Sequence, residues 1–166
     1  MKLNFCPECA APLRKQDATT YRCDQGHPYY NNPRAACSII LVNEQGELLY
    51  AKRARDPAKG KYDFPGGFLD YGEDAWQAAR REAAEELGIS IAPADLELID
   101  SEANTYMEHV TTCDFIFLCR SWQGEPVAAD DVAALEWHDV GFLRTDRFCW
   151  SYPYLFDTLQ TKLASL

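Results

Sequence analysis

Apolar and polar positions alternate after residue 33 in a pattern that predicts paired strands. Residues 35–42 (AACSIILV) are an apolar run typical of a buried strand, and residues 47–53 (ELLYAKR) are a second such run. The four residues between them, NEQG, predict a turn, so the two runs are expected to form a β-hairpin. The next segment, DPAKGKYDFPGG, is rich in glycine and proline and predicts a loop.

Further strands are expected at residues 96–106, 110–122 and 133–140. In the second of these, the period-two alternation of a strand places Cys113, Phe115, Phe117 and Cys119 on one face and Ile116 and Leu118 on the other. Both faces of this strand are therefore apolar.

A helix is predicted over residues 73–87, because Trp76, Ala79, Ala83 and Leu87 recur at helical spacing and form one narrow apolar stripe. Gly88 then provides a natural C-terminal cap. A last helix is expected to begin near Pro153 and to cover residues 154–166. Strands in the middle of the chain with helices around them predict an α+β fold with a mixed sheet.

The first 33 residues have a different character, with paired cysteines, prolines, turn residues and little apolar periodicity. A segment of this size without a core needs another source of stability. We therefore predict two domains, residues 1–33 and residues 34–166.

Composition favours an ordinary soluble domain. The 166 residues are 47% hydrophobic and 25% charged, which allows a real core. We expect a soluble cytoplasmic protein, because no apolar run approaches the roughly 20 residues of a membrane span and the first residues lack the apolar region of a signal peptide. Seven cysteines, an odd number, do not suggest a disulfide framework. Four of them are expected to be small buried side chains, namely Cys37, Cys113, Cys119 and Cys149.

The net charge of −10 is unevenly distributed. Residues 67–102 hold ten acidic residues against two arginines, whereas residues 52–61 hold five basic residues against Asp56 alone. An acidic helix that follows a basic strand suits a site that binds a cation and an anionic ligand together. The overall acidity argues against broad contact with a nucleic-acid backbone.

Three carboxylates lie close together on the predicted helix. Glu82, Glu85 and Glu86 stand at positions i, i+3 and i+4, so they project as one cluster, and Arg81 precedes Glu85 by four residues. Repulsion within such a cluster is reversed by a divalent cation, because Mg²⁺ binds oxygen ligands and bridges carboxylates to phosphates. Taken alone, these residues also fit an ordinary solvated helix face.

The spacing around the cluster distinguishes between these two interpretations. From Gly67 there are five residues to Glu73 and seven more to Arg81-Glu82, followed by Ala83, Ala84, Glu85, Glu86, Leu87, Gly88 and Ile89. This resembles the signature of the Nudix hydrolases at every polar and glycine position, with Ala83 where that family usually has a larger aliphatic residue. The resemblance implies an α/β/α sandwich with a mixed sheet and hydrolysis of a nucleoside diphosphate linked to another group.

The resemblance also implies roles for individual residues. Glu82, Glu85 and Glu86 would bind Mg²⁺ or Mn²⁺, with one glutamate of the set as the general base, while Glu73 would be a further metal group and Arg81 an orienting partner. Gly66, Gly67 and Gly72 would let the loop pass close to the metal. Arg53 is a candidate contact to the diphosphate or else a solvated cation. A further acidic ligand is expected from Asp130 or Asp131, with Glu136 a weaker candidate.

The N-terminal cysteines resemble a zinc ribbon. Cys6-Pro-Glu-Cys9 is followed by Cys23 and His27, which together could provide a tetrahedral structural Zn²⁺ site. Such a metal would explain how a segment without a core stays folded. The second half reads CDQGH rather than CxxC, so a knuckle that has lost its metal is the alternative.

Features of the substrate are only partly indicated. The segment HPYYNNPR resembles the linker between a zinc ribbon and a Nudix domain in the branches related to NADH and ADP-ribose pyrophosphatases. The SQPWPFP-type segment of NADH hydrolases and the proline of ADP-ribose hydrolases are both missing. Tyr106 resembles a tyrosine of dinucleoside polyphosphate hydrolases. The substrate is left open among nucleotide sugars, ADP-ribose, dinucleotides and FAD.

A second class of function remains open, a nucleotide-sensing Nudix domain with a nucleic-acid-binding ribbon. The intact glutamate set argues against lost catalysis, and the few basic residues of the ribbon, Lys2, Arg14, Lys15 and Arg22, argue against nucleic-acid binding. The expected partner is a small-molecule nucleotide, with neither nucleic acid nor membrane. The aromatic run FCWSYPYLF could cover a homodimer interface or cap the core.

Overall fold

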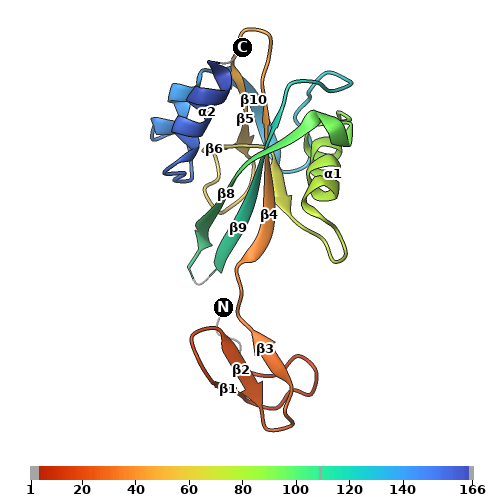
Figure 1. Cartoon of the computed structure of the whole chain (residues 1–166), viewed down its shortest axis with the longest axis vertical. Coiled ribbons are helices and arrows are strands. Elements are labelled where there is room, and N and C mark those ends of the chain that lie inside the picture. The colour runs from red at the N-terminus through yellow and green to blue at the C-terminus, as the bar shows by residue number, and fades with distance from the viewer. Residues whose placement is uncertain (1–3, 109, 165–166) are drawn as a thin grey trace.

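The computed structural model describes residues 4–108 and 110–164, which form two parts (Figure 1). The N-terminal part is a three-stranded antiparallel sheet of β1 (Leu13–Lys15), β2 (Thr20–Cys23) and β3 (Pro28–Tyr30), in the order β1-β2-β3. Figure 1 shows it as a separate lobe that the short connection after β3 joins to the rest of the chain. The predicted division between residues 33 and 34 remains a prediction and lies immediately before β4.

Two sheets form the larger part. The four-stranded sheet has the order β7-β4-β9-β8, with strands β4 (Arg34–Leu41), β7 (Gly66–Phe68), β8 (Leu96–Met107) and β9 (Val110–Cys119). It is mixed, because β4 runs parallel to β9 and antiparallel to β7. The three-stranded sheet has the order β10-β5-β6, with strands β5 (Leu48–Arg53), β6 (Tyr62–Asp63) and β10 (Val132–His138).

The predicted hairpin of β4 and β5 is wrong beyond its turn. The two strands meet at the bridge between Val42 and Leu48, beside a turn in which Asn43 N donates to Glu47 O over 3.0 Å. Beyond this turn β4 pairs with β7 and β9, while β5 pairs with β6 and β10. Each strand therefore has both edges occupied by other partners, and the two sheets diverge from a shared turn.

Helix α1 (Ala75–Leu87) begins two residues after its predicted start, because Asp74 caps it and forms a reciprocal capping box with Gln77. It ends at Gly88, which has the left-handed φ of 67° expected of such a cap. Small side chains bring the helix close to β4 and β7; its buried apolar residues are Ala75, Ala78, Ala79, Ala83 and Leu87. Trp76, predicted on this stripe, is 39% exposed and lies at its edge, where its ring packs edge-on against Phe117.

Helix α2 (Leu155–Leu163) covers the opposite side of the strands from α1 (Figure 1). It starts later than the predicted Pro153, and residues 165–166 of the prediction lie outside the described residues. Two 3₁₀ helices, η1 (Pro93–Asp95) and η2 (Val140–Arg144), complete the fold. None of the helices in the described part of the chain is long and apolar enough to cross a bilayer.

The core is divided by the sheets into two halves. The predicted alternation of β9 is confirmed, because Phe117 and Cys119 pack in the α1 half whereas Ile116 and Leu118 pack in the α2 half. Of the cysteines predicted to be buried, Cys37 and Cys119 are buried, while Cys113 and Cys149 are half-buried. Strands between two helical layers confirm the predicted α+β class with a mixed sheet.

Candidate active site

Two consecutive glycines let β7 lie against its neighbours. A Cβ at Gly66, where φ is +145°, would lie 2.1 Å from the carbonyl oxygen of Cys37. A Cβ at Gly67 would lie 2.4 Å from Glu82 Oε1. Gly66 must be glycine because the clash would be with backbone, whereas a side chain at Gly67 would displace the carboxylate of Glu82. The loop backbone therefore approaches β4 on one side and α1 on the other. Gly72, also predicted to allow close approach, faces open space and instead turns the chain with a φ of +89°.

Glu86 is the most deeply buried carboxylate of the helix, with 9% of the residue exposed. Its Oε2 accepts a hydrogen bond from Gly66 N over 2.9 Å. Burial raises the pKa of Glu86 to about 8, and the negative charges of Glu82, Asp63 and Asp131 add to the rise, against the opposing effect of the Gly66 N–H. A positive charge is needed here for this carboxylate to be ionised at neutral pH.

Glu82 and Glu85 share Arg81 as a partner. Arg81 Nη1 donates to Glu82 Oε1 over 2.8 Å and to Glu85 Oε2 over 3.0 Å. Glu82 is mostly buried, and burial raises its pKa although Arg81 opposes the rise. The Glu85 side chain is 50% exposed. The three glutamates therefore span a range of environments, from the buried Glu86 to the half-exposed Glu85.

Glu73 acts on this cluster through Arg81. Its two carboxylate oxygens accept from Arg81 Nε and Nη2 over 2.9 and 3.0 Å, and the Arg81 hydrogen bonds hold the pKa of Glu73 below its usual value. Arg81 Nη2 also donates to Phe68 O over 3.0 Å. Among the predicted site residues, Glu73 lies outside the cavity wall, so the structure places it behind the arginine.

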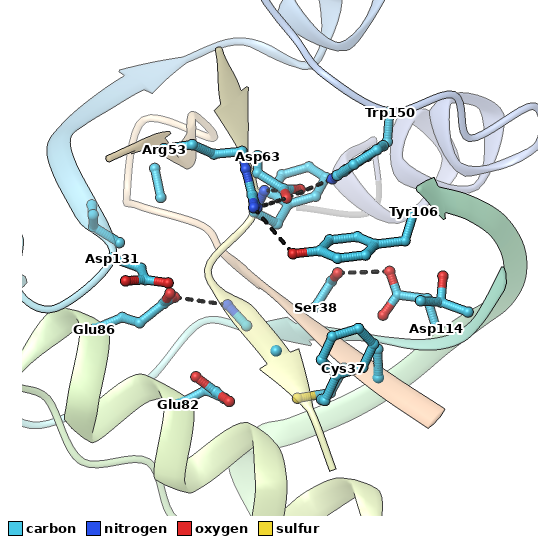
Figure 2. Close-up of a pocket in the computed structure, with 18 of the residues that line it drawn as sticks. Cys37, Ser38, Arg53, Asp63, Glu82, Glu86, Tyr106, Asp114, Asp131 and Trp150 are labelled. Atoms are coloured by element: carbon cyan, nitrogen blue, oxygen red, sulfur yellow. Dashed lines mark hydrogen bonds and ion pairs between the residues drawn. The ribbon is translucent and has the colours of Figure 1, made fainter. Parts of the chain in front are cut away.

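The loop before β10 brings two more carboxylates to the same place. Asp130 and Asp131 both form ion pairs with Arg55, the shorter one being 2.7 Å between Arg55 Nη1 and Asp131 Oδ1. The loop is tied to the helix by a hydrogen bond from Ala129 N to Glu86 O, 2.9 Å long. Figure 2 shows Asp131 beside Glu86.

Glu136, the weaker candidate ligand, lies elsewhere. It accepts hydrogen bonds from Tyr62 and Arg147 and shares one with His138, and these interactions lower its pKa to about 2. It is not among the residues that line the cavity. Of the acidic residues predicted from the sequence as metal ligands, those that line the cavity are thus Glu82, Glu85, Glu86, Asp130 and Asp131.

These residues form one end of a cavity of about 360 Å³. Its walls include nearly every residue predicted from the sequence for the catalytic site, namely Arg53, Gly66, Gly67, Arg81, Glu82, Glu85, Glu86, Tyr106, Asp130 and Asp131. The cavity continues beyond β7 to residues that the sequence reasoning missed, namely Ser38, Asp63, Asn104, Asp114, Trp150 and Tyr152.

Arg53 and Tyr106 meet in the middle of this cavity, together with Asp63 and Trp150 (Figure 2). Arg53 donates from Nη1 to Asp63 Oδ2 over 3.1 Å and from Nη2 to the Tyr106 hydroxyl over 3.4 Å. Trp150 Nε1 donates to Asp63 Oδ2 over 2.6 Å. Burial raises the pKa of Asp63, against the influence of these partners. In the sequence, the only feature that pointed to Asp63 was its position shortly before Pro65-Gly66-Gly67. Trp150 is one of several aromatic residues in the run FCWSYPYLF, and nothing in the sequence distinguished it from the others.

The far end of the cavity is built around Asp114 of β9. Ser38 Oγ and the Tyr152 hydroxyl each donate to Asp114 Oδ2 over 2.8 Å. Burial raises the pKa of Asp114 to about 6, although both hydroxyls oppose the rise. The only signal in the sequence was a single charged residue within an apolar strand.

Comparison with known proteins identifies this arrangement. The family model described as the NUDIX domain matches residues 32–157. The chain belongs to the Nudix family. The residues matched by the Nudix family model include helix α1, strand β7 and every residue that lines the cavity.

Relatives that are named for a pyrophosphatase activity support the same assignment. The 8-oxo-dGTP diphosphatase of Escherichia coli is 32% identical over 111 residues, which cover 66% of this chain and 82% of that protein. The ADP-ribose pyrophosphatase of Methanocaldococcus jannaschii is 30% identical over 132 residues, covering 79% and 73% of the two chains. This Nudix protein is accordingly a pyrophosphatase enzyme.

A solved Nudix hydrolase from Nitrosomonas europaea matches the fold with a TM-score of 0.69 at 20% identity. The match covers 98% of this chain and 92% of that one. The likeness of fold therefore includes the N-terminal lobe as well as the Nudix domain.

The N-terminal lobe brings its predicted ligands together. One ligand atom from each of Cys6, Cys9, Cys23 and His27 lies within 4.8 Å of all the others. The Sγ atoms of Cys9 and Cys23 are 3.7 Å apart, as are Cys6 Sγ and His27 Nδ1. A tetrahedral Zn²⁺ with bonds of about 2.3 Å to sulfur requires ligand atoms about 3.8 Å apart, so the cluster fits this ion.

Proposed function

We propose that this protein is a Mg²⁺- or Mn²⁺-dependent Nudix pyrophosphohydrolase that cleaves the diphosphate bond of a nucleoside diphosphate linked to another moiety. The observation that carries the proposal is that the buried Glu86 and the mostly buried Glu82 side chain lie against the Gly66–Gly67 backbone, at one end of a cavity of about 360 Å³. Two buried carboxylates with raised pKa values favour a bound cation.

The donor set fits a hard divalent ion. Glu82, Glu86 and Glu85 offer carboxylate oxygens on one side, and Asp131 offers another from the opposite loop. All of these are oxygen ligands of the kind that Mg²⁺ and Mn²⁺ bind. When bound, the ion neutralises diphosphate oxygens and activates water.

The chain's own residues would orient the reacting groups. Water attacks one phosphorus and the bridging oxygen leaves with the other fragment, so two phosphorylated products form. One carboxylate of the glutamate set takes the proton from the water. Arg81 fixes Glu82 and Glu85 in place, and Glu73 fixes Arg81. Arg53, whose guanidinium already binds Asp63 and Tyr106, reaches the diphosphate as a neighbouring positive charge.

The substrate proposed is a small nucleotide, rather than nucleic acid. Two relatives are named for 8-oxo-dGTP and for ADP-ribose, and others are named for NAD(P)H and for NAD-capped RNA. The first of these adds nucleoside triphosphates to the classes to be tested. Tyr106 and Trp150 supply aromatic surface in the cavity. A homodimer is not required for the cavity, because Phe148 of the aromatic run is buried and Trp150 and Tyr152 line the cavity of the same chain.

We propose a structural Zn²⁺ in the N-terminal lobe, bound by Cys6, Cys9, Cys23 and His27. Positive φ angles at Ala10 and Gly26 turn the chain beside the two ligand pairs. The second ring nitrogen of His27 lies 3.7 Å from Glu8 Oε2, so a carboxylate stands next to the proposed histidine ligand. Four protein ligands leave no open position, so this ion would stabilise the fold rather than take part in catalysis.

The test is a screen of nucleoside triphosphates, nucleotide sugars, ADP-ribose, dinucleotides and FAD with Mg²⁺ and Mn²⁺, scored by product identity. We expect two phosphorylated products from at least one compound, and Glu85→Gln and Glu86→Gln variants that lower kcat by about 10²-fold or more while remaining folded. Unchanged turnover in both variants would remove the metal site. No turnover of any compound by the wild type, with nucleotide binding retained, would favour the nucleotide-sensing alternative.

A further inference from the structure

Two polar atoms in the cavity wall are buried without a hydrogen bond. Among residues 4–108 and 110–164, the buried side-chain atoms without such a partner are Asn104 Nδ2, Asp114 Oδ1 and Asp131 Oδ1. Asp131 Oδ1 still has its ion pair with Arg55. Asn104 and Asp114 therefore offer one free donor and one free acceptor, and both residues line the cavity. Buried polar atoms normally have partners, so a ligand is the natural candidate for these two.

The sheet places the two side chains on the same face. Strands β8 and β9 are antiparallel, with Asn104 opposite Thr112 and Glu102 opposite Asp114. Asn104 and Asp114 are therefore diagonal neighbours, with Cβ atoms about 7 Å apart. Asp114 is only 5% exposed, and its Oδ2 is held by Ser38 and Tyr152, so Oδ1 is the oxygen left for a ligand.

An aromatic wall stands beside this polar pair. Tyr106 lies two residues after Asn104 on the same strand, and its ring centroid is 5.5 Å from that of Trp150. Arg53 lies over both rings. A flat heterocycle can stack on such a surface while its edge forms hydrogen bonds.

The polar pair and the acidic cluster lie at opposite ends of the cavity. Figure 2 shows Asp114 and Ser38 on one side and Glu82, Glu86 and Asp131 on the other, with Tyr106 on the same side as Asp114. A nucleotide whose phosphates lie at the glutamates would therefore direct its base toward β8 and β9.

We propose that Asn104 and Asp114 bind the nucleobase of the substrate, with Asn104 Nδ2 donating to a ring nitrogen or carbonyl oxygen and Asp114 Oδ1 accepting from a neighbouring N–H. This assignment rests on the proposed function, since it concerns the end of the nucleotide remote from the reacting phosphates. A site built to hydrogen-bond one edge discriminates strongly against bases that leave its buried groups unmatched. Asn104 and Asp114 thus decide which base is accepted.

The proposal is tested by calorimetric titration of the full-length protein, in Mg²⁺, with the four common nucleoside 5′-monophosphates, inosine 5′-monophosphate and ribose 5-phosphate. We expect at least one nucleotide to bind ten times more tightly than ribose 5-phosphate. Asn104→Ser and Asp114→Asn should each reduce that margin about tenfold or more without changing the affinity for ribose 5-phosphate. Asn104→Asp, which replaces a donor by an acceptor, should change the order of preference among the bases.

A matched control is Glu102→Gln. Glu102 lies opposite Asp114 on the same buried face, but its carboxylate accepts from the backbone N–H groups of Tyr154 and Leu155 at the start of α2 rather than lining the cavity. This variant should keep the wild-type base preference. A wild type with no margin over ribose 5-phosphate, or a margin unchanged in folded Asn104→Ser and Asp114→Asn, would overturn the proposal.

Hydrolysis is measured separately so that the two proposals can fail independently. In Glu85→Gln, turnover should fall while the nucleotide still binds more tightly than ribose 5-phosphate. A base margin in a wild type that hydrolyses nothing would overturn the proposed hydrolysis alone. Hydrolysis that is indifferent to the base would overturn the role of Asn104 and Asp114 alone.

Discussion

Gly66 and Glu86 are joined by a hydrogen bond of 2.9 Å from the backbone nitrogen of one to Oε2 of the other. The bond links β7 to α1 and partly opposes the rise in the pKa of Glu86 that burial causes. It depends on a glycine whose Cα faces the Cys37 carbonyl. The backbone position and the acidic side chain are therefore a single structural unit.

Replacing Gly66 by alanine should separate them. The new Cβ would lie 2.1 Å from Cys37 O at a φ of +145°, so β7 must move. We expect a loss of about 2 kcal/mol or more in the free energy of unfolding, measured by urea denaturation, together with loss of turnover. Gly72→Ala is the control: its Cβ meets open space, so only the smaller cost of the left-handed backbone, about 1 kcal/mol, is expected.

Glu86→Gln should remove a loss of stability that the metal-free protein shows at high pH. The folded pKa of about 8 lies above the ordinary 4.5, so the stability associated with protonated Glu86 is present below pH 4.5 and is lost as the pH rises through 8. At pH 9 without metal, Glu86→Gln should therefore melt at a higher temperature than the wild type.

Mg²⁺ should stabilise the wild type at pH 9 and should stabilise Glu86→Gln much less, because the ion would compensate a charge that the variant lacks. Thermal unfolding with and without Mg²⁺ measures both effects. Glu97→Gln, an exposed glutamate paired with Arg120, should keep the wild-type response. An equal response of all three proteins would contradict the placement of the ion at Glu86.

Arg81→Lys should impair catalysis more than folding. Arg81 binds Glu73, Glu82, Glu85 and Phe68 O through three nitrogens, a geometry that a lysine ammonium cannot reproduce. We expect kcat to fall about 10- to 100-fold in steady-state assays. Arg80→Lys is a matched control, because Arg80, the neighbour of Arg81 on the helix, donates to Ile91 O instead of to the glutamates. Similar kinetics for the two variants would show that Arg81 does not orient the site.

Asp114→Asn should remove the contribution that protonated Asp114 makes to the stability of the protein at low pH. Burial raises the pKa of Asp114 from 3.8 to about 6, so its contribution to stability is full below pH 3.8 and disappears as the pH rises through 6. The shift corresponds to about 3 kcal/mol in the difference between wild type and variant. Urea denaturation from pH 3.5 to 7.5 gives this difference directly, and a difference that does not vary with pH would contradict it.

The ribbon should contain about one Zn²⁺ per chain, measured by elemental analysis of protein purified without chelator. Cys6→Ser should lower the zinc content and increase hydrogen exchange in residues 4–33, while leaving the kcat of the Nudix domain within about twofold, because the proposed metal would stabilise the lobe alone. Cys113→Ser, a cysteine of β9 outside the cluster, should keep its zinc. Protein without zinc that retains full protection of the lobe would support the metal-free alternative.

Local patterns in the sequence were sufficient to predict several elements. The alternation of β9, the end of α1 at Gly88 and the convergence of Glu82, Glu85 and Glu86 all depend on spacing within one element. The true partners of β4 and β5 could not be predicted in this way, because strand pairing depends on which edges other strands occupy, and those strands come from distant parts of the chain.

The sequence by itself determined the family, the acidic helix and the glycines beside it, since these are encoded within one continuous stretch of 23 residues. Only the tertiary structure decided which residues complete the cavity. Asp63, Asn104, Asp114 and Trp150 come from four separate segments, and each appears ordinary within its own segment. Their common position, and the burial that shifts the pKa values of Asp63 and Asp114, arise only when the strands pack together.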